Sequence, residues 1–166
     1  VVPAMDKLGD MLDSRLAVSL HATNNELRDQ LVPINKKYPL EELIPACHRF
    51  IEKQNVRTRI TFEYVMLDGV NDTDQHAREL VKLLKGIPTL MTLIPFNPFK
   101  GSGYKTSSAK RVNQFSEILM ESGMTTVTRR TRGDDIDAAC GQLIGKVEDK
   151  SRRDRRFEKP RFGMNL

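Results

Sequence analysis

The sequence has no apolar stretch long enough to span a bilayer and only two cysteines. Its longest apolar run, TLMTLIPF at residues 89–96, is far shorter than the roughly 20 residues of a membrane helix. No basic-then-apolar leader opens the chain, which argues against secretion. Two cysteines are too few for a disulfide scaffold, so free thiols in a reducing compartment are expected. These absences predict a cytoplasmic protein that does not contact membranes.

Several signatures of catalytic and cofactor sites are missing as well. The chain has neither a G-x-S-x-G nucleophile motif nor a phosphate-binding P-loop. The GSG at residues 101–103 lacks the third glycine of a dinucleotide fingerprint. Cys47 and His48 are neighbours, and with Cys140 far away they match no zinc-binding spacing. The residues of this chain therefore predict no metal site of their own.

The composition that remains is typical of a folded domain, with 39% hydrophobic and 30% charged residues. The net charge of +5 belongs to the C-terminal end. Residues 150–166 hold seven Lys or Arg against two acidic residues, which leaves 20 basic and 20 acidic side chains in the remainder. Such a tail either contacts phosphate groups or only keeps the protein soluble, and both interpretations stay open.

The body of the chain repeats one plan, in which a short apolar run and a polar loop precede an amphipathic helix. Strands are expected at 16–20, 59–67, 89–97 and 125–130. Helices are expected at the start of the chain and around 40–51, 77–84 and 112–119. Repeated β-loop-α units predict an α/β fold with parallel strands covered by helices. Because so few strands cannot close a barrel, we expect an open sheet or part of a larger protein.

Three local signals bear on the helix boundaries. Thr23 with Glu26 has the spacing of a capping box, and Asp72 with Gln75 resembles a second helix start. Pro45 falls inside an apolar stripe, which predicts a kink or a late helix start there.

Polar side chains follow the ends of the predicted strands. Ser19 and His21 are two residues apart at the end of the first strand, so they point the same way. They face a small polar ligand or satisfy loop backbone groups. Asn97, between Phe96 and Pro98, offers a donor and an acceptor to a base or carboxylate, or forms an ordinary turn. Function in barrels of parallel strands gathers at this carboxyl edge.

The two cysteines stand in different surroundings. Cys47 falls on an apolar helical stripe and is interpreted as a small buried hydrophobe. Cys140 lies between Ala139 and Gly141, so a large group can approach its thiol closely. In the preceding TRRTRGDDID, arginines favour the thiolate and aspartates oppose it, which leaves its reactivity open.

Three stretches carry a resemblance to a known family. They are LAVSLHA with the following LVPINKKYPLEEL, LIPFNPF, and TRRTRGDDIDAACGQL. Together they closely resemble the adenine-C2 RNA methyltransferases of the radical S-adenosylmethionine class, of the dual-specificity 23S rRNA and tRNA type. The resemblance covers residues 1–147, and the basic tail at 148–166 lies outside it. It implies the C-terminal part of a partial, TIM-like (β/α)6 barrel.

The resemblance also implies a cofactor site. Ser19, Leu20 and His21 would line the S-adenosylmethionine site, and Asn97 would contact the same cofactor. Cys140 would carry the methyl group as a thioether before its transfer to adenine C2. A 4Fe–4S cluster, supplied with electrons by a reducing partner, belongs to the family's chemistry. Its C-x3-C-x2-C ligand motif is absent from this sequence.

Two further family residues are also missing: an acidic residue, and a second cysteine that forms a disulfide with the methyl carrier. Both, like the cluster motif, lie upstream in the family, so we expect an upstream half of the same polypeptide. This chain alone is expected to bind no cluster and to be inactive. Its exposed strand edge is expected to favour association.

Three alternatives stay open at this stage. One is a non-catalytic RNA-binding module that uses residues 129–132 and the tail on phosphates. The second is the related C8-methylating resistance enzyme. The third is a hydrolytic pair of Cys140 and His21, which needs the two side chains in contact and an oxyanion hole.

Overall fold

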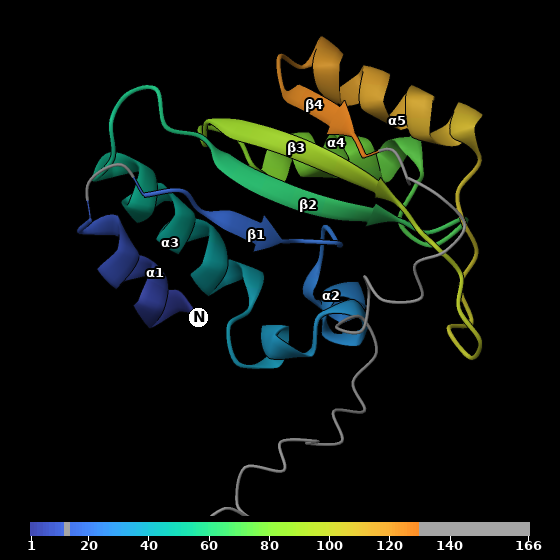
Figure 1. Cartoon of the computed structure of the whole chain (residues 1–166), viewed down its shortest axis with the longest axis horizontal. Coiled ribbons are helices and arrows are strands. Elements are labelled where there is room, and N and C mark those ends of the chain that lie inside the picture. The colour runs from blue at the N-terminus through green and yellow to red at the C-terminus, as the bar shows by residue number, and fades with distance from the viewer. Residues whose placement is uncertain (12–13, 130–166) are drawn as a thin grey trace, which may run out of the picture.

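The structure is a computed structural model that describes residues 1–11 and 14–129 (Figure 1). Its centre is a four-stranded sheet in the order β1-β2-β3-β4, with every neighbouring pair parallel. The strands are β1 (Ala17–Ser19), β2 (Ile60–Met66), β3 (Thr89–Pro95) and β4 (Thr125–Thr128). The α/β fold with parallel strands, predicted from the repeated units, is confirmed.

Helices connect the strands, and four of them cover one face of the sheet. They are α1 (Val2–Gly9), α2 (Asn25–Leu31), the 3-10 turn η1 (Pro33–Lys36), α3 (Leu40–Glu52), α4 (Asp74–Leu83) and α5 (Ala109–Glu121). Figure 1 shows α1 and α3 near β1, and α4 and α5 near β3 and β4. Residues of all four contribute to a single hydrophobic core with the strands. Within the described ranges no helix is long and apolar enough to cross a membrane.

The two faces of the sheet differ because side chains alternate along each strand. Val18, Phe62 and Met91 pair across three strands and lie in the helix-covered core. The next row, Ser19, Glu63 and Thr92, pairs in the same way and points to the opposite face. On this open face Ser19 is exposed, and Glu63 and Thr92 are half-buried.

A second, smaller cluster closes the carboxyl end of the open face. There Val65 and Leu67, at the end of β2, pack against Leu31 of α2 and Phe96 after β3. The candidate ligand-binding edge therefore rests on its own apolar support, separate from the main core. The open face is left polar in its middle and apolar at its carboxyl end.

Both predicted helix starts are displaced by one residue. Asn24, rather than Thr23, caps α2, because its extended backbone lets Oδ1 accept from the amide of Leu27 at 2.9 Å. The Thr23 hydroxyl donates instead to Glu79 at 2.6 Å. Thr73, rather than Asp72, caps α4 and forms the capping box. Capping residues at adjacent positions have the same sequence spacing, so only the side-chain contacts distinguish them.

The prediction for Pro45 was wrong about a late start. The helix α3 begins at Leu40, directly after Pro39, and runs through Pro45 to Glu52. The Pro45 side chain is exposed, so its ring places no strain on core packing. Cys47 is fully buried on the apolar side of this helix, as its stripe predicted.

Candidate functional site

The chain turns sharply after β1, at the first predicted site. His21 has φ 58°, and it is the one residue other than glycine with positive φ among those the structure describes. The amide of Ala22 donates to the carbonyl of Leu20 at 2.8 Å, the i to i+2 bond of a γ-turn. A residue with a side chain held in this region costs about 1–3 kcal/mol and persists only where its surroundings over-determine it.

The His21 ring is a neutral hydrogen-bond acceptor on one side. It is 6% exposed, and its Nδ1 accepts from the amide of Val65 at 3.1 Å. An accepting Nδ1 carries no proton, so in the neutral ring the proton is on Nε2. Burial lowers the pKa of His21 to about 4, and the neighbouring Arg28 charge lowers this pKa further. At neutral pH the ring therefore offers an Nε2–H donor.

Asn71 joins the ends of β1 and β2. It is fully buried, and its Nδ2 donates to the carbonyls of His21 at 2.9 Å and Val65 at 2.7 Å. Its Oδ1 accepts from the amide of Leu67 at 2.8 Å, and its carbonyl accepts from the Tyr64 hydroxyl at 2.7 Å. Asn71 thus satisfies backbone groups of both strand ends and helps to hold the γ-turn.

The three residues of the Ser19–His21 segment lie in different environments. Ser19 is exposed on the open face, and its hydroxyl donates to Oε2 of Glu63 at 3.3 Å. The Leu20 side chain is fully buried in the main core. The amide of Leu20 donates to the carbonyl of Glu63 at 3.0 Å. Ser19 and Glu63 are therefore polar side chains of the open face, while Leu20 anchors the segment in the core.

Asn97 is exposed and follows β3 at the same carboxyl edge. The preceding Phe96 is 3% exposed, and its carbonyl accepts from the Thr106 hydroxyl at 2.6 Å. Leu67 and Thr106 form an antiparallel bridge that ties the far end of the loop to the end of β2. β2 separates β1 from β3, and the register pairs Ser19 through Glu63 with Thr92, which lies five residues before Asn97. Ser19 and Asn97 are therefore offset both across the sheet and along the strands.

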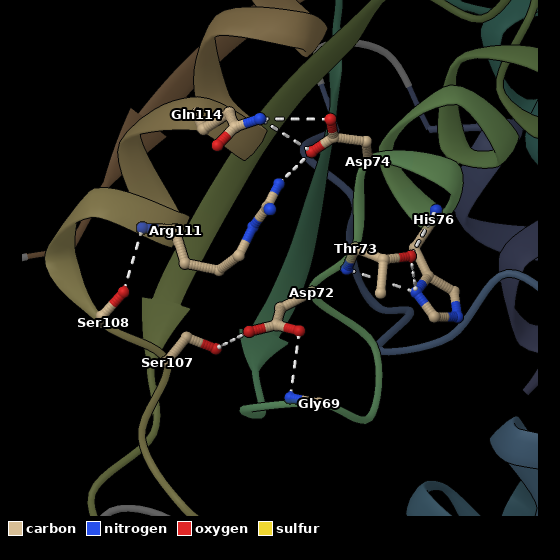
Figure 2. A network of polar contacts seen from close by, with 9 residues as sticks. All are labelled: Gly69, Asp72, Thr73, Asp74, His76, Ser107, Ser108, Arg111 and Gln114. Atoms are coloured by element: carbon tan, nitrogen blue, oxygen red, sulfur yellow. Dashed lines mark hydrogen bonds and ion pairs between the residues drawn. The ribbon is translucent and has the colours of Figure 1, made fainter.

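A polar network fixes the loops that follow β2 and β3 (Figure 2). The carboxylate of Asp72, 2% exposed, accepts from the Ser107 hydroxyl at 2.7 Å. Asp74, in the first turn of α4, forms an ion pair with Arg111 of α5 and accepts from Gln114 at 3.1 and 3.2 Å. Both carboxylates are paired with side chains of this same chain. They therefore fix the positions of the loops and do not serve as free ligand groups.

The chemistry available from the two cysteines follows their position. Cys140, the predicted methyl carrier, lies outside the described residues, as do Arg130, Arg132 and the basic tail. Cys47 is free, and burial raises the pKa of its thiol to about 12, so it stays protonated and unreactive. The described residues contain no group of three or more His, Cys, Asp or Glu that could hold a metal ion.

Arg28 and Glu63 were not identified from the sequence as residues of the carboxyl edge. It was also not predicted that Asn71 forms the central hydrogen bonds there. Arg28 of α2 is 3% exposed, and it was not singled out from the sequence. One signal was present: Arg28 is three residues before Leu31, so it shares the buried side of its helix. Glu63 interrupts an apolar strand, which marks a residue on the face opposite the core.

The chain was compared with protein-family models and with solved structures. No protein-family model matches the chain. The chain is similar to a radical SAM methyltransferase from Sphaerobacter thermophilus, with 46% sequence identity and a TM-score of 0.78. The match covers 86% of this chain and 42% of that protein, so the chain spans less than half of its relative.

A more distant likeness shows the fold alone. A domain of a pyruvate-formate lyase-activating enzyme from Bacteroides vulgatus superposes with a TM-score of 0.54 at 15% identity, covering 78% of this chain and 73% of that one. The four parallel strands alternating with helices thus have the radical SAM partial-barrel fold, and the chain is related to a radical SAM methyltransferase.

Proposed function

Because the chain is related to part of a radical SAM methyltransferase, we propose that it is the cofactor-lining part of an RNA methyltransferase. The proposed reaction is methylation of adenine C2 in 23S rRNA and tRNA. The main support for a cofactor site here is the strained turn at His21, which lies at the carboxyl edge of the sheet beside the exposed Ser19. Strain of this kind gathers at ligand sites.

The residues present fit S-adenosylmethionine. Ser19 supplies a hydroxyl, His21 an Nε2–H donor and Asn97 an amide, all at the edge where parallel folds bind ligands. Leu20 contributes by anchoring the segment, since its side chain is in the core. When bound, S-adenosylmethionine supplies the methyl group and, with a 4Fe–4S cluster, the radical chemistry.

The cluster itself does not fit this chain. No C-x3-C-x2-C motif occurs in the sequence, and the described residues form no metal-binding group. Its ligands, the second cysteine and the acidic residue are therefore assigned to other parts of the complete protein. A reducing partner would supply electrons to the cluster there. Residues 1–166 alone, reconstituted anaerobically with iron and sulfide, are expected to show no iron–sulfur absorbance.

Cys140 is proposed as the methyl carrier. Adenine C2 is a poor nucleophile, so direct displacement from a sulfonium is disfavoured there, and a covalent route divides the reaction into easier steps. The sequence neighbours of Cys140, Ala139 and Gly141, have little side-chain bulk, which is compatible with a large group approaching the thiol. The adenine must leave its stack to reach this sulfur, as in other base-modifying enzymes.

The test replaces Cys140 in the complete, reconstituted protein. Cys140→Ala is expected to abolish methylation of a 23S rRNA fragment and of tRNA, measured by mass spectrometry of the digested nucleosides. Cys47→Ala is the matched control, because Cys47 is buried and unreactive, and it is expected to retain methylation. Methylation that survives Cys140→Ala contradicts the carrier role. An 8-methyladenosine product, or RNA binding without any product, would replace the C2 assignment.

A further inference from the structure

A buried arginine supports the backbone of the candidate cofactor site. Arg28 of α2 donates from Nε to the carbonyl of Leu20 and from one terminal nitrogen to the carbonyl of Ser19, both at 3.1 Å. Its other terminal nitrogen donates to Oδ1 of Asn35 at 2.5 Å. All three guanidinium nitrogens are therefore directed to carbonyl oxygens, and two of these oxygens belong to the segment that ends at His21.

Asn35 holds the guanidinium from the far side. It is 1% exposed in η1, and its Nδ2 donates to Asp29 at 2.7 Å and to Oδ1 of Asn25 at 3.1 Å. Asn25 in turn accepts from the amide of Leu40 at 2.9 Å, at the start of α3. Asn35 and the Leu40 amide, both in the LVPINKKYPLEEL stretch, thus belong to a hydrogen-bonded chain with Asn25 that ends on Arg28.

The γ-turn at His21 needs support of this kind. Asn71 and the Val65 amide hold the turn from the side of β2. Arg28 holds the Leu20 carbonyl, which opens the turn, and the Ser19 carbonyl before it, from the side of α2. A planar guanidinium presents its donors in a fixed fork, so a flexible lysine ammonium cannot reproduce the same three contacts.

We propose that Arg28 is a positioning residue for cofactor binding, which fixes the Ser19 and Leu20 carbonyls so that the Ser19 hydroxyl and the His21 ring face the ligand. The inference rests on the proposed S-adenosylmethionine site. Arg28 itself does not contact the cofactor, because its donors are committed to the backbone and to Asn35. Its loss therefore weakens cofactor binding through the geometry of the turn.

The experiment measures S-adenosylmethionine affinity in the complete, reconstituted protein by anaerobic equilibrium dialysis. Arg28→Lys keeps the charge and loses the fork. It is expected to weaken S-adenosylmethionine binding by about 10-fold or more, as when groups that orient metal ligands are removed. Affinity for a 23S rRNA fragment is expected to stay within about two-fold.

Two controls separate positioning from general stability. Arg49→Lys changes an exposed arginine paired with Asp6, and it is expected to leave cofactor affinity unchanged. Leu119→Ala opens the core in α5, so it is expected to lower the thermal midpoint without weakening cofactor binding. The inference is overturned if Arg28→Lys binds the cofactor as the wild type does. It is equally overturned if Leu119→Ala weakens cofactor binding as much.

A second variant covers the case in which Arg28→Lys does not fold. Asn35→Ser removes one acceptor of Arg28 and is expected to weaken cofactor binding by a smaller factor at unchanged RNA affinity. Unchanged cofactor affinity in Asn35→Ser then overturns the inference. A wild-type protein that binds no S-adenosylmethionine overturns the proposed function instead, and the role of Arg28 with it.

Discussion

The loops after β1 and β3 both leave the carboxyl edge of the sheet, and they reach unusual backbone conformations by different means. The turn after β1 places His21 at φ 58° and surrounds it with buried hydrogen bonds. The loop after β3 uses Gly101 and Gly103 at φ 87° and 69°, where an added Cβ would meet nothing within 4 Å. The first is preorganised by packing, whereas the second depends on the intrinsic freedom of glycine.

The difference assigns the two regions different tasks. A rigid turn holds ligand groups at fixed positions, which lowers the cost of ordering them on binding. The loop after β3 instead carries an exposed Asn97 and two glycines at positive φ. Asn71, which follows β2 and donates to the His21 carbonyl, is fully buried, whereas Asn97 after β3 is exposed.

The largest expected effect breaks the rigid turn. Asn71→Ala leaves backbone groups of His21, Val65 and Leu67 unpaired, and it is expected to lower the free energy of unfolding by about 3–5 kcal/mol. The matched Asn97→Ala is expected to change it by less than about 0.5 kcal/mol. Urea unfolding followed by circular dichroism measures both. Equal losses of unfolding free energy in the two variants would contradict the distinction between the buried turn at His21 and the loop after β3.

A second prediction uses pH on the same turn. The folded-state pKa of His21 is lowered to about 4 from the ordinary 6.5, so between these values the unfolded state binds more protons. Stability is therefore full above pH 6.5 and falls as pH drops towards 4, by about 3 kcal/mol for this group.

Unfolding measured across this pH range checks the effect. His21→Gln is expected to remove most of the decrease in unfolding free energy between pH 6.5 and pH 4. His48→Gln, a change on α3, is expected to show the same decrease as the wild type. A pH dependence that is the same in both variants would show that another group causes it.

The smallest expected effect concerns the loop after β3. Gly101→Ala meets no atom but forces a side chain into positive φ, so it is expected to cost about 1 kcal/mol. Cofactor affinity is expected to stay at the wild-type value, because Asn97 is held from the side of Phe96 and Thr106. Thermal unfolding and equilibrium dialysis measure the two quantities. A loss of cofactor affinity would show that the loop, like the turn, is preorganised.

Much of the fold was predictable because its signals are local. Apolar runs marked the strands, and stripes at helical spacing marked α3, α4 and α5. Cys47 was correctly placed in the core from its position on such a stripe. The caps at Asn24 and Thr73 were missed by one residue, since the neighbouring Thr23 and Asp72 are equally good capping types.

The candidate site was predictable only in outline. Ser19, His21 and Asn97 were located at strand ends, and in the structure Ser19 ends β1 while His21 and Asn97 each lie two residues beyond their strand. Their roles in cofactor binding stay proposals, as does that of Cys140. The spacing of Arg28 from Leu31 indicated its buried side, but its role could not be found, because its acceptors are backbone carbonyls eight and nine residues earlier.

The sequence by itself determined the order of elements, the parallel α/β class and the residues at the strand ends. These follow from hydrophobic periodicity and turn-forming residues, which act over a few positions. Only the tertiary structure decided that His21 is neutral and strained, that Asn71 joins two strands, and that Arg28 faces inward. Each of these depends on hydrogen bonds between segments distant in sequence or folded back on one another, and desolvation makes such bonds strong once they are formed.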